Sequence, residues 1–361
     1  MNQNVLKGIF IVLVIIDHND FARGVIAPFL KGMGFHVMGF LMIPFLRPAP
    51  AWNREFAHYL FRLYYPYFVM VTALSIFVAF LTPVTPAEQV GRWVHSLYSG
   101  HSGILKETTH MALLWFLPSF FSLVLLRTWI EHVGGKFKFL AIGVLWVAHP
   151  LIGPIAMATR DYLPLGLLPA IYVLPLAYLG IALHRILLQP LGAVSAIGLS
   201  AMLFFLIKAI QINFGFDNEI GFVAVADYRD PFELLINDAE AITGVLMVFQ
   251  ISRLRWERLQ LGRVLEMIGK YSLQMYLFHA FVALLVYKLT MLAIGETTLL
   301  VLFGLSLLTT ILLTLPLARF AAKQPLIRRS LFPRSLHELM RPPRVQAIAT
   351  SQDLKGQESG R

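Results

Sequence analysis

The sequence predicts an all-α fold: a polytopic membrane helix bundle of about ten transmembrane helices with both termini in the cytoplasm. First, 57% of the 361 residues are hydrophobic and only 14% are charged, whereas soluble domains average about 25% charged residues. Second, apolar stretches of about 20 residues, the length that crosses a bilayer as a helix, recur about ten times. Third, lysine and arginine gather in alternate connecting segments.

The predicted spans occupy most of the chain. The first carries an apolar run and ends in DHND rather than in the small residues of a signal-peptide cleavage site, so we expect it to be retained. The ninth is long and is expected to tilt or to extend into an interface. The approximate limits are 5–24, 29–46, 63–82, 112–130, 139–157, 163–183, 191–213, 234–251, 264–292 and 298–318.

Basic residues orient these spans. With the N-terminus inside, the inner segments hold nineteen lysines and arginines and the outer segments hold six. Cytoplasmic segments of membrane proteins carry such an excess. The net charge of +10 therefore follows mostly from topology. We expect the lipid bilayer as a partner and no nucleic acid.

The chain divides into a transmembrane domain, residues 1–320, and a basic, proline-rich cytoplasmic tail, residues 321–361, which we expect to be mostly disordered. Two outer connections are long, 83–111 and 214–233. They mix aromatic residues with acids or histidines, which suits contact with a sugar but also occurs in ordinary soluble loops. The absence of cysteine excludes disulfides, thiolate metal sites and a cysteine nucleophile.

The first span carries two ionisable side chains on one face. Lys7 and His18 are eleven positions apart, about three helical turns plus roughly 20°, so both project from one side, roughly 16 Å apart along the axis. An ionisable side chain at membrane depth costs about 3 kcal/mol or more unless it faces a partner or a polar cavity. The pattern indicates a polar track through the protein. Alternatively, Lys7 snorkels to the cytoplasmic interface while His18 caps the outer end.

Several further histidines lie in or beside predicted spans: His36, His110, His149 and His279. Imidazole is the side chain best able to take and return a proton near neutral pH. Any one of them is more often a helix-packing partner than a catalyst, but several in one bundle favour a polar interior. No HxxxH or HExxH pair is present, so we expect no metal site.

Three other positions carry candidate chemistry. Tyr276 and His279 have the i, i+3 spacing that places two side chains on neighbouring positions of one helix face, where they line a groove or simply pack. Arg62 begins the third span from the cytoplasmic side, where it either binds a phosphate or anchors the helix. Trp115 packs in the core by default. No GxSxG, Walker or GxGxxG motif in the required context indicates a hydrolase, nucleotide triphosphatase or dinucleotide site.

Taken in order, these segments resemble the membrane acyltransferase-3 family, ten-span enzymes that O-acylate cell-surface carbohydrates and related acceptors. The family's first span has a basic residue, ten intervening residues and a histidine, which Lys7 and His18 match, although arginine is usual at the first position. FHVMGFLMIPFL around His36 is similar to the second span. RLYYPYF at Arg62 is similar to the third, with Tyr59 in place of a usual second arginine. LLWFLPSFF and YSLQMYLFHAF resemble the family's fourth-span and late Tyr-x-x-His segments.

The resemblance implies transfer of an acyl group from cytoplasmic acyl-CoA, with acetyl-CoA as the expected donor, to a hydroxyl of a cell-surface or exported polysaccharide. It implies His18 as the catalytic base or transient acyl carrier, and Lys7 and Arg62 as ligands of the donor's phosphates. It also implies a bacterial-type inner membrane as the location. The residues expected to line the tunnel or place the acceptor are Asp20, His36, His110, Trp115, Tyr276 and His279.

Two other classes remain open on the sequence. A glycan transporter or flippase would use the same polar track without forming an ester. A non-catalytic scaffold would use the buried polar residues only to join helices. The side chains of Asp17 and His18 leave the helix about 100° apart, because they are adjacent in sequence. We therefore expect Asp20 or a residue of another span, rather than Asp17, to orient the imidazole.

Overall fold

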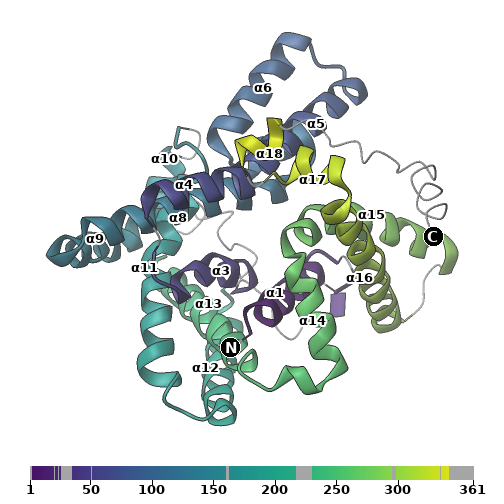
Figure 1. The fold of residues 1–361 in the computed structure, drawn as a ribbon. Coiled ribbons are helices and arrows are strands. Elements are labelled where there is room, and N and C mark those ends of the chain that lie inside the picture. Colours follow the sequence, from purple (N-terminus) through teal and green to yellow (C-terminus); the bar gives the residue numbers. More distant parts are fainter. Residues whose placement is uncertain are drawn as a thin grey trace, which may run out of the picture.

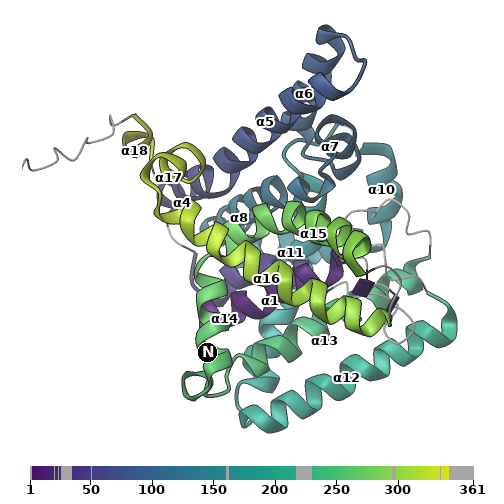
Figure 2. The same cartoon turned by 90° about the vertical axis from the view of Figure 1, so that its right-hand side faces the viewer.

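The described part of the chain consists of helices and their connections, without a strand. The structure is a computed structural model, and it describes residues 2–19, 21–22, 24–25, 35–49, 51–159, 162–216, 230–294, 298–333 and 335–340. In the two views of Figures 1 and 2, α1 lies among the other helices, whereas α6 projects from one end of the bundle.

The helices follow the chain order, with short 3₁₀ or π turns labelled η. They are α1 (Gln3–Asp17), α3 (Phe35–Met42), η1 (Ile43–Leu46), α4 (Trp52–Tyr59), η2 (Leu60–Tyr64), α5 (Tyr65–Leu81), α6 (Pro86–Ser99), α7 (Ser102–Thr109), η3 (Ala112–Trp115), α8 (Phe116–Val133), α9 (Gly135–Ala148), η4 (His149–Leu151), α10 (Ile152–Thr159), α11 (Leu167–Leu183), η5 (His184–Leu188), α12 (Ala193–Phe214), α13 (Pro231–Ile251), η7 (Trp256–Arg258), α14 (Gln260–Lys270), α15 (Ser272–Ile294), α16 (Leu299–Lys323), α17 (Pro325–Leu331) and α18 (Leu336–Met340).

The all-α membrane bundle is confirmed, and seven stretches within the described residues are long and apolar enough to cross a bilayer. They match the third, fourth and sixth to tenth predicted spans. The total of ten and the sides of the termini stay predictions. The seven are Phe56–Leu81, Ala112–Val133, Leu167–Leu188, Ala193–Phe214, Pro231–Ile251, Ser272–Leu292 and Leu299–Lys323.

Two predicted spans are wrong as single helices. The fifth, 139–157, is broken at His149, where the 3₁₀ turn η4 separates α9 from α10, because Pro150 lacks the N–H that would continue the helix. The ninth, 264–292, is two helices that meet at Tyr271. α14 turns Gly262, Leu265 and Gly269 inward and leaves its charged residues exposed, so it is an amphipathic helix beside the true span α15.

α1 is the centre of the bundle although it is short. Its 15 residues extend about 22 Å, less than a bilayer's hydrocarbon thickness of about 30 Å. It contacts α3, α13, α14, α15 and α16. The contact with α14 needs glycine on both sides, because a Cβ on Gly8 would lie 2.0 Å from the carbonyl oxygen of Leu265, and one on Gly269 would lie 1.7 Å from that of Asn4.

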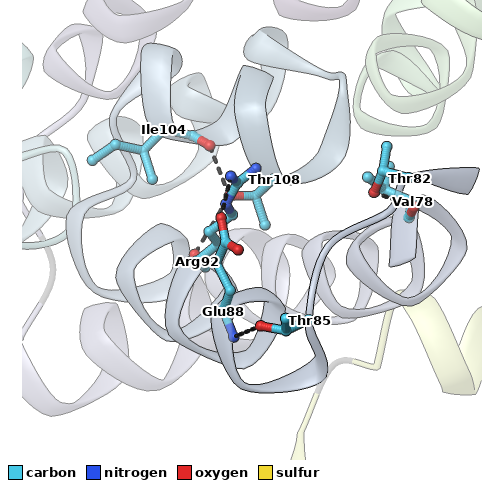
Figure 3. Close-up of polar contacts among 7 residues, drawn as sticks. All are labelled: Val78, Thr82, Thr85, Glu88, Arg92, Ile104 and Thr108. Carbon is cyan, nitrogen blue, oxygen red and sulfur yellow. Dashed lines mark hydrogen bonds and ion pairs between the residues drawn. The ribbon is translucent and has the colours of Figure 1, made fainter. Parts of the chain in front are cut away.

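The connection 83–111, predicted to lie outside, is mostly helical, and Figure 3 shows part of it. Thr85 caps α6 by accepting a hydrogen bond from the backbone N–H of Glu88 at 3.3 Å, and Glu88 pairs with Arg92 at 2.5 Å one turn on. The Thr108 hydroxyl donates to the carbonyl of Ile104 at 2.8 Å, one turn earlier in the same helix, α7. Of the second long connection, 214–233, residues 217–229 lie outside the described part.

The predicted tail begins inside α16 and continues through two short helices. α17 and α18 are joined by an ion pair between Arg328 and Glu338 at 2.7 Å, so residues 321–340 contain more helix than the sequence predicts. Residues 341–361 lie outside the described residues.

Candidate functional site

Two histidine rings meet at the C-terminal end of α1. His18 ends the helix as its C-cap residue, and His279 lies on α15, which packs against α1. The ring centroids are 5.3 Å apart and the planes are inclined by 72°. His279 is fully buried, whereas His18 is half-buried. The sequence predicts both residues for the site, and the structure brings them together.

The backbone fixes the same tautomer on both rings. The Nδ1 of His18 lies 2.8 Å from the carbonyl oxygen of Val14, and the Nδ1 of His279 lies 2.7 Å from that of Tyr276. A carbonyl only accepts, so each Nδ1 carries the proton and each Nε2 keeps its lone pair in the neutral ring. Within the described residues the Nε2 of His279 has no hydrogen-bond partner. The neutral pair therefore presents two ring nitrogens with free lone pairs, one on the fully buried His279 and one on the half-buried His18.

His36 and Asp17 lie next to this pair without joining it. The Nε2 of the buried His36 is 3.6 Å from a carboxylate oxygen of Asp17. Asp17 thus faces His36 rather than His18, in keeping with its direction on the helix. Asp20, predicted as the alternative orienting group, lies outside the described residues. The carbonyl of Val14 holds the His18 ring, a role that no side-chain pattern in the sequence indicates.

A polar cavity of about 230 Å³ lies at the opposite, N-terminal end of α1. Besides α1 it is lined by α3, η1 and the residue after it, the α4–η2 segment, the start of α8 and the start of α15. Its basic lining residues are Lys7, Arg47, His58 and Arg62, and its described lining contains no aspartate or glutamate. A lysine and two arginines thus gather in one hollow whose described lining has no carboxylate, which favours an anion there.

A π turn places Arg62 in this cavity. Within η2 the backbone N–H of Tyr65 donates to the carbonyl of Leu60, five residues back. Pro66 explains the widened turn, because it has no N–H to offer the carbonyl of Arg62 and its ring would collide with that carbonyl in a regular helix. π turns recur at functional sites. The Nη1 of Arg62 then lies 3.4 Å from the Nε2 of His58.

The described lining of the cavity ends about one turn short of the histidine pair on α15 and about two turns short of it on α1. Tyr276 lines the cavity, and its ring lies 5.8 Å from His279. On α1 the described lining reaches Ile11 but not Val14 or His18. Lys7 and His18 therefore stand at the two ends of one helix, as their spacing predicts, with an apolar turn and the Tyr276 ring between them.

Tyr276 and Phe116 form the wall on the α8 side, whereas Trp115, predicted to line the tunnel, is not among the lining residues of this cavity. The Tyr276 hydroxyl donates to the carbonyl of Leu113 in η3, and its ring lies 5.0 Å from Phe116. Trp115 is buried beside Phe116, with centroids 6.3 Å apart. His110 lies apart from this wall: it is exposed, ends α7 with φ of 56°, and does not line the cavity.

Two residues of the cavity, Arg47 and His58, are not among the site residues predicted from the sequence. Arg47 counted only as a positive-inside charge, since it follows the second predicted span. Its approach to Lys7 depends on the 3₁₀ turn η1, which no local pattern predicts. His58 carried a signal, because it stands four positions before Arg62 on the same face. Within the described residues no group of three or more His, Asp or Glu side chains could hold a metal ion.

Comparison with known proteins gives one match. The model of a family described as an acyltransferase domain, the acyltransferase-3 family, matches residues 3–319. Neither the search of curated proteins nor that of solved structures gave a match. The matched residues include α1, the cationic cavity and both histidines of the pair.

Proposed function

Because the chain belongs to the acyltransferase-3 family and is a membrane acyltransferase, we propose that it transfers acetyl from cytoplasmic acetyl-CoA to a hydroxyl of a cell-surface or exported glycan. The observation that carries the proposal is α1 itself, with a cationic cavity whose described lining has no carboxylate at one end, and two imidazoles protonated at Nδ1 at the other. We further propose that the protein resides in a bacterial-type inner membrane.

The cationic cavity suits the donor. Coenzyme A carries several phosphates, and Lys7, Arg47 and Arg62 would bind them from three different helical elements. A volume of about 230 Å³ is below the usual range of about 300–1,000 Å³ for whole ligands. The cavity would therefore hold one phosphate-bearing part of the donor, and the thioester would reach inward along Ile11 and Tyr276.

His18 would carry the transfer through its Nε2. As a general base, this nitrogen takes the proton of the acceptor hydroxyl while the oxygen attacks the thioester carbonyl. The C–S bond breaks, the ester C–O bond forms, and the proton passes to the departing thiolate, so no proton is gained or lost. As an acyl carrier, the same Nε2 first attacks the thioester carbonyl, so that the C–S bond breaks and the thiolate of coenzyme A leaves. The acceptor oxygen then attacks the acyl-imidazole, the C–N bond breaks as the ester C–O bond forms, and the hydroxyl proton replaces the one that the thiolate takes up. Both routes need the tautomer that Val14 fixes.

Replacement of His18 tests this assignment. We expect His18→Ala to lower acyl transfer by about 10²–10⁴-fold, the range of a general base, and to leave the folded protein intact. The assay measures consumption of labelled acetyl-CoA by membranes and the acetyl mass gain of surface polysaccharide by mass spectrometry. His95→Ala, an exposed histidine of α6, is the matched control and should retain activity.

The same assay separates the alternatives. Label that stays on the protein when acceptor is withheld, and is lost in His18→Ala, identifies the acyl-carrier route. Unchanged transfer in His18→Ala removes the residue from its role. Relocation of unmodified glycan without consumption of acetyl-CoA would instead establish the transporter or flippase.

A further inference from the structure

A second basic hollow lies beside the donor cavity, between α8, α9, α11 and the segment after η1. Its volume is about 750 Å³. Its rim carries Arg47, Arg127, Lys138 and Arg185, and its other wall is apolar, with Phe139, Ile142 and Trp146 of α9 facing Leu179 of α11. Nothing in the acyl transfer described above uses this hollow, apart from Arg47, which borders both.

The rim has more positive charge than its one described carboxylate can balance. The Glu131 carboxylate accepts hydrogen bonds from the Lys138 ammonium at 2.7 Å and from the Tyr178 hydroxyl at 2.9 Å. Arg127 donates to the carbonyl of Arg47, and Arg185 donates to the carbonyl of Phe45 at 3.3 Å. Those bonds hold the end of η1, but a carbonyl carries no net charge. Four cations thus share a single carboxylate, and the excess favours an anion.

Arg127 makes this a built site rather than a solvated charged face. Its side chain belongs to a residue only 3% exposed, and its guanidinium lies 5.0 Å from the centre of the Phe45 ring. The Glu131 carboxylate, one helical turn away, lies near enough to interact with this guanidinium, and the four cations around that carboxylate leave the rim an excess of positive charge. A phosphate at the rim would come close to Arg127 and Arg185 together, because both arginines converge on the same short backbone segment.

The apolar wall identifies the kind of anion. α9 extends away from the bundle (Figure 1), and it is apolar and exposed along its length, with Phe139 at 74% and Val147 at 81%. In a membrane protein such a surface faces lipid tails. A ligand in the hollow would therefore have its charged end among the arginines and its apolar end along α9 and α11, which is the shape of a phospholipid.

We propose that this hollow binds an anionic phospholipid of the cytoplasmic leaflet, with the phosphate at Arg127 and Arg185 and an acyl chain along Phe139, Ile142 and Leu179. Basic pockets between helices at the cytoplasmic side are typical sites for anionic headgroups. The inference is independent of the acyl donor and acceptor proposed above.

Native mass spectrometry of the full chain released from nanodiscs tests the proposal. With equal phosphatidylglycerol and phosphatidylcholine, we expect one retained phosphatidylglycerol and little phosphatidylcholine. Arg185→Gln, an exposed position of the rim, should lower phosphatidylglycerol retention about tenfold, equivalent to about 1.4 kcal/mol. Arg255→Gln, an exposed arginine that borders neither hollow, is the matched control and should change nothing.

Two further arms identify the occupant. Ile142→Ser with Leu179→Ser keeps the rim charges and should also reduce retention, since it removes the apolar wall. Equal retention of both lipids, or equal loss in the two arginine variants, overturns the proposal. Displacement of the lipid by millimolar inorganic phosphate overturns it in favour of a simple anion site, and displacement by acetyl-CoA overturns it in favour of a donor subsite.

Discussion

Two polar regions inside the bundle differ in whether a carboxylate lies beside their cations. Around α13, Lys208 is only 2% exposed and lies 3.2 Å from a carboxylate oxygen of Glu240, which is itself fully buried. Around α1, Lys7 shares its cavity with Arg47 and Arg62, and the described lining has no carboxylate. The first region thus contains a carboxylate that balances its buried lysine, whereas the described lining of the second contains none.

The histidines of the two regions differ in the same way. His149 uses its Nε2 on the carboxylate of Asp238 at 2.6 Å and stacks on Tyr172 at 5.0 Å, and the Tyr172 hydroxyl donates to the same carboxylate. His18 and His279 instead each hydrogen-bond a backbone carbonyl through Nδ1. A satisfied polar cluster stabilises a fold. A cluster with basic atoms left over is equipped for chemistry.

The largest effect that sharpens this contrast is on stability. Glu240→Gln should lower the free energy of unfolding by about 3–5 kcal/mol, because it leaves the buried Lys208 without its counter-charge. Thermal unfolding of the purified protein in detergent measures the loss. Acyl transfer per folded molecule should stay unchanged.

The double variant Lys208→Met with Glu240→Leu is the control, since it removes both charges and should recover most of the stability. A Glu240→Gln protein that is stable but inactive would contradict the contrast. It would place the α13 network on a substrate or proton path, as the transporter interpretation requires.

The contrast also explains how far the sequence could predict the molecule. Composition and apolar run length predict the membrane bundle, and helical spacing places Lys7 and His18 on one helix, because both depend on neighbours along the chain. The pairs His149–Asp238 and Lys208–Glu240 join residues 89 and 32 positions apart, so no local period reveals them. For this reason the sequence singles out His149 as a histidine beside a span but does not indicate the carboxylate that it meets.

The next effect is on donor binding. Lys7→Ala should raise the KM for acetyl-CoA about tenfold, equivalent to about 1.4 kcal/mol, with a smaller change in kcat, since the ammonium lies at the phosphate end of α1. Folding stability should not fall, because removing one of three neighbouring cations relieves repulsion. Steady-state kinetics with labelled acetyl-CoA measures the change.

Lys7→Arg is the matched control. It keeps the charge and supplies the residue usual in the family, so it should bind the donor at least as well as the native chain. A fall in kcat with unchanged KM in Lys7→Ala would instead show that Lys7 acts at the chemical step, and that the division of α1 into a binding end and a reacting end is wrong.

The smallest effect comes from His58, whose Nε2 accepts at 3.4 Å from the Nη1 of Arg62 when its ring is neutral. His58→Gln keeps a polar side chain beside Arg62 and removes no permanent charge, so the KM for acetyl-CoA should change by only about twofold, the size of a weak exposed polar contact. Steady-state kinetics at pH 8, where an exposed imidazole is mostly neutral, measures the effect of this contact on the KM. An effect as large as that of Lys7→Ala would mean that the ring is charged in the cavity. His58 would then count as a fourth cation, and the excess charge that distinguishes α1 from α13 would be greater than the lysine and two arginines provide.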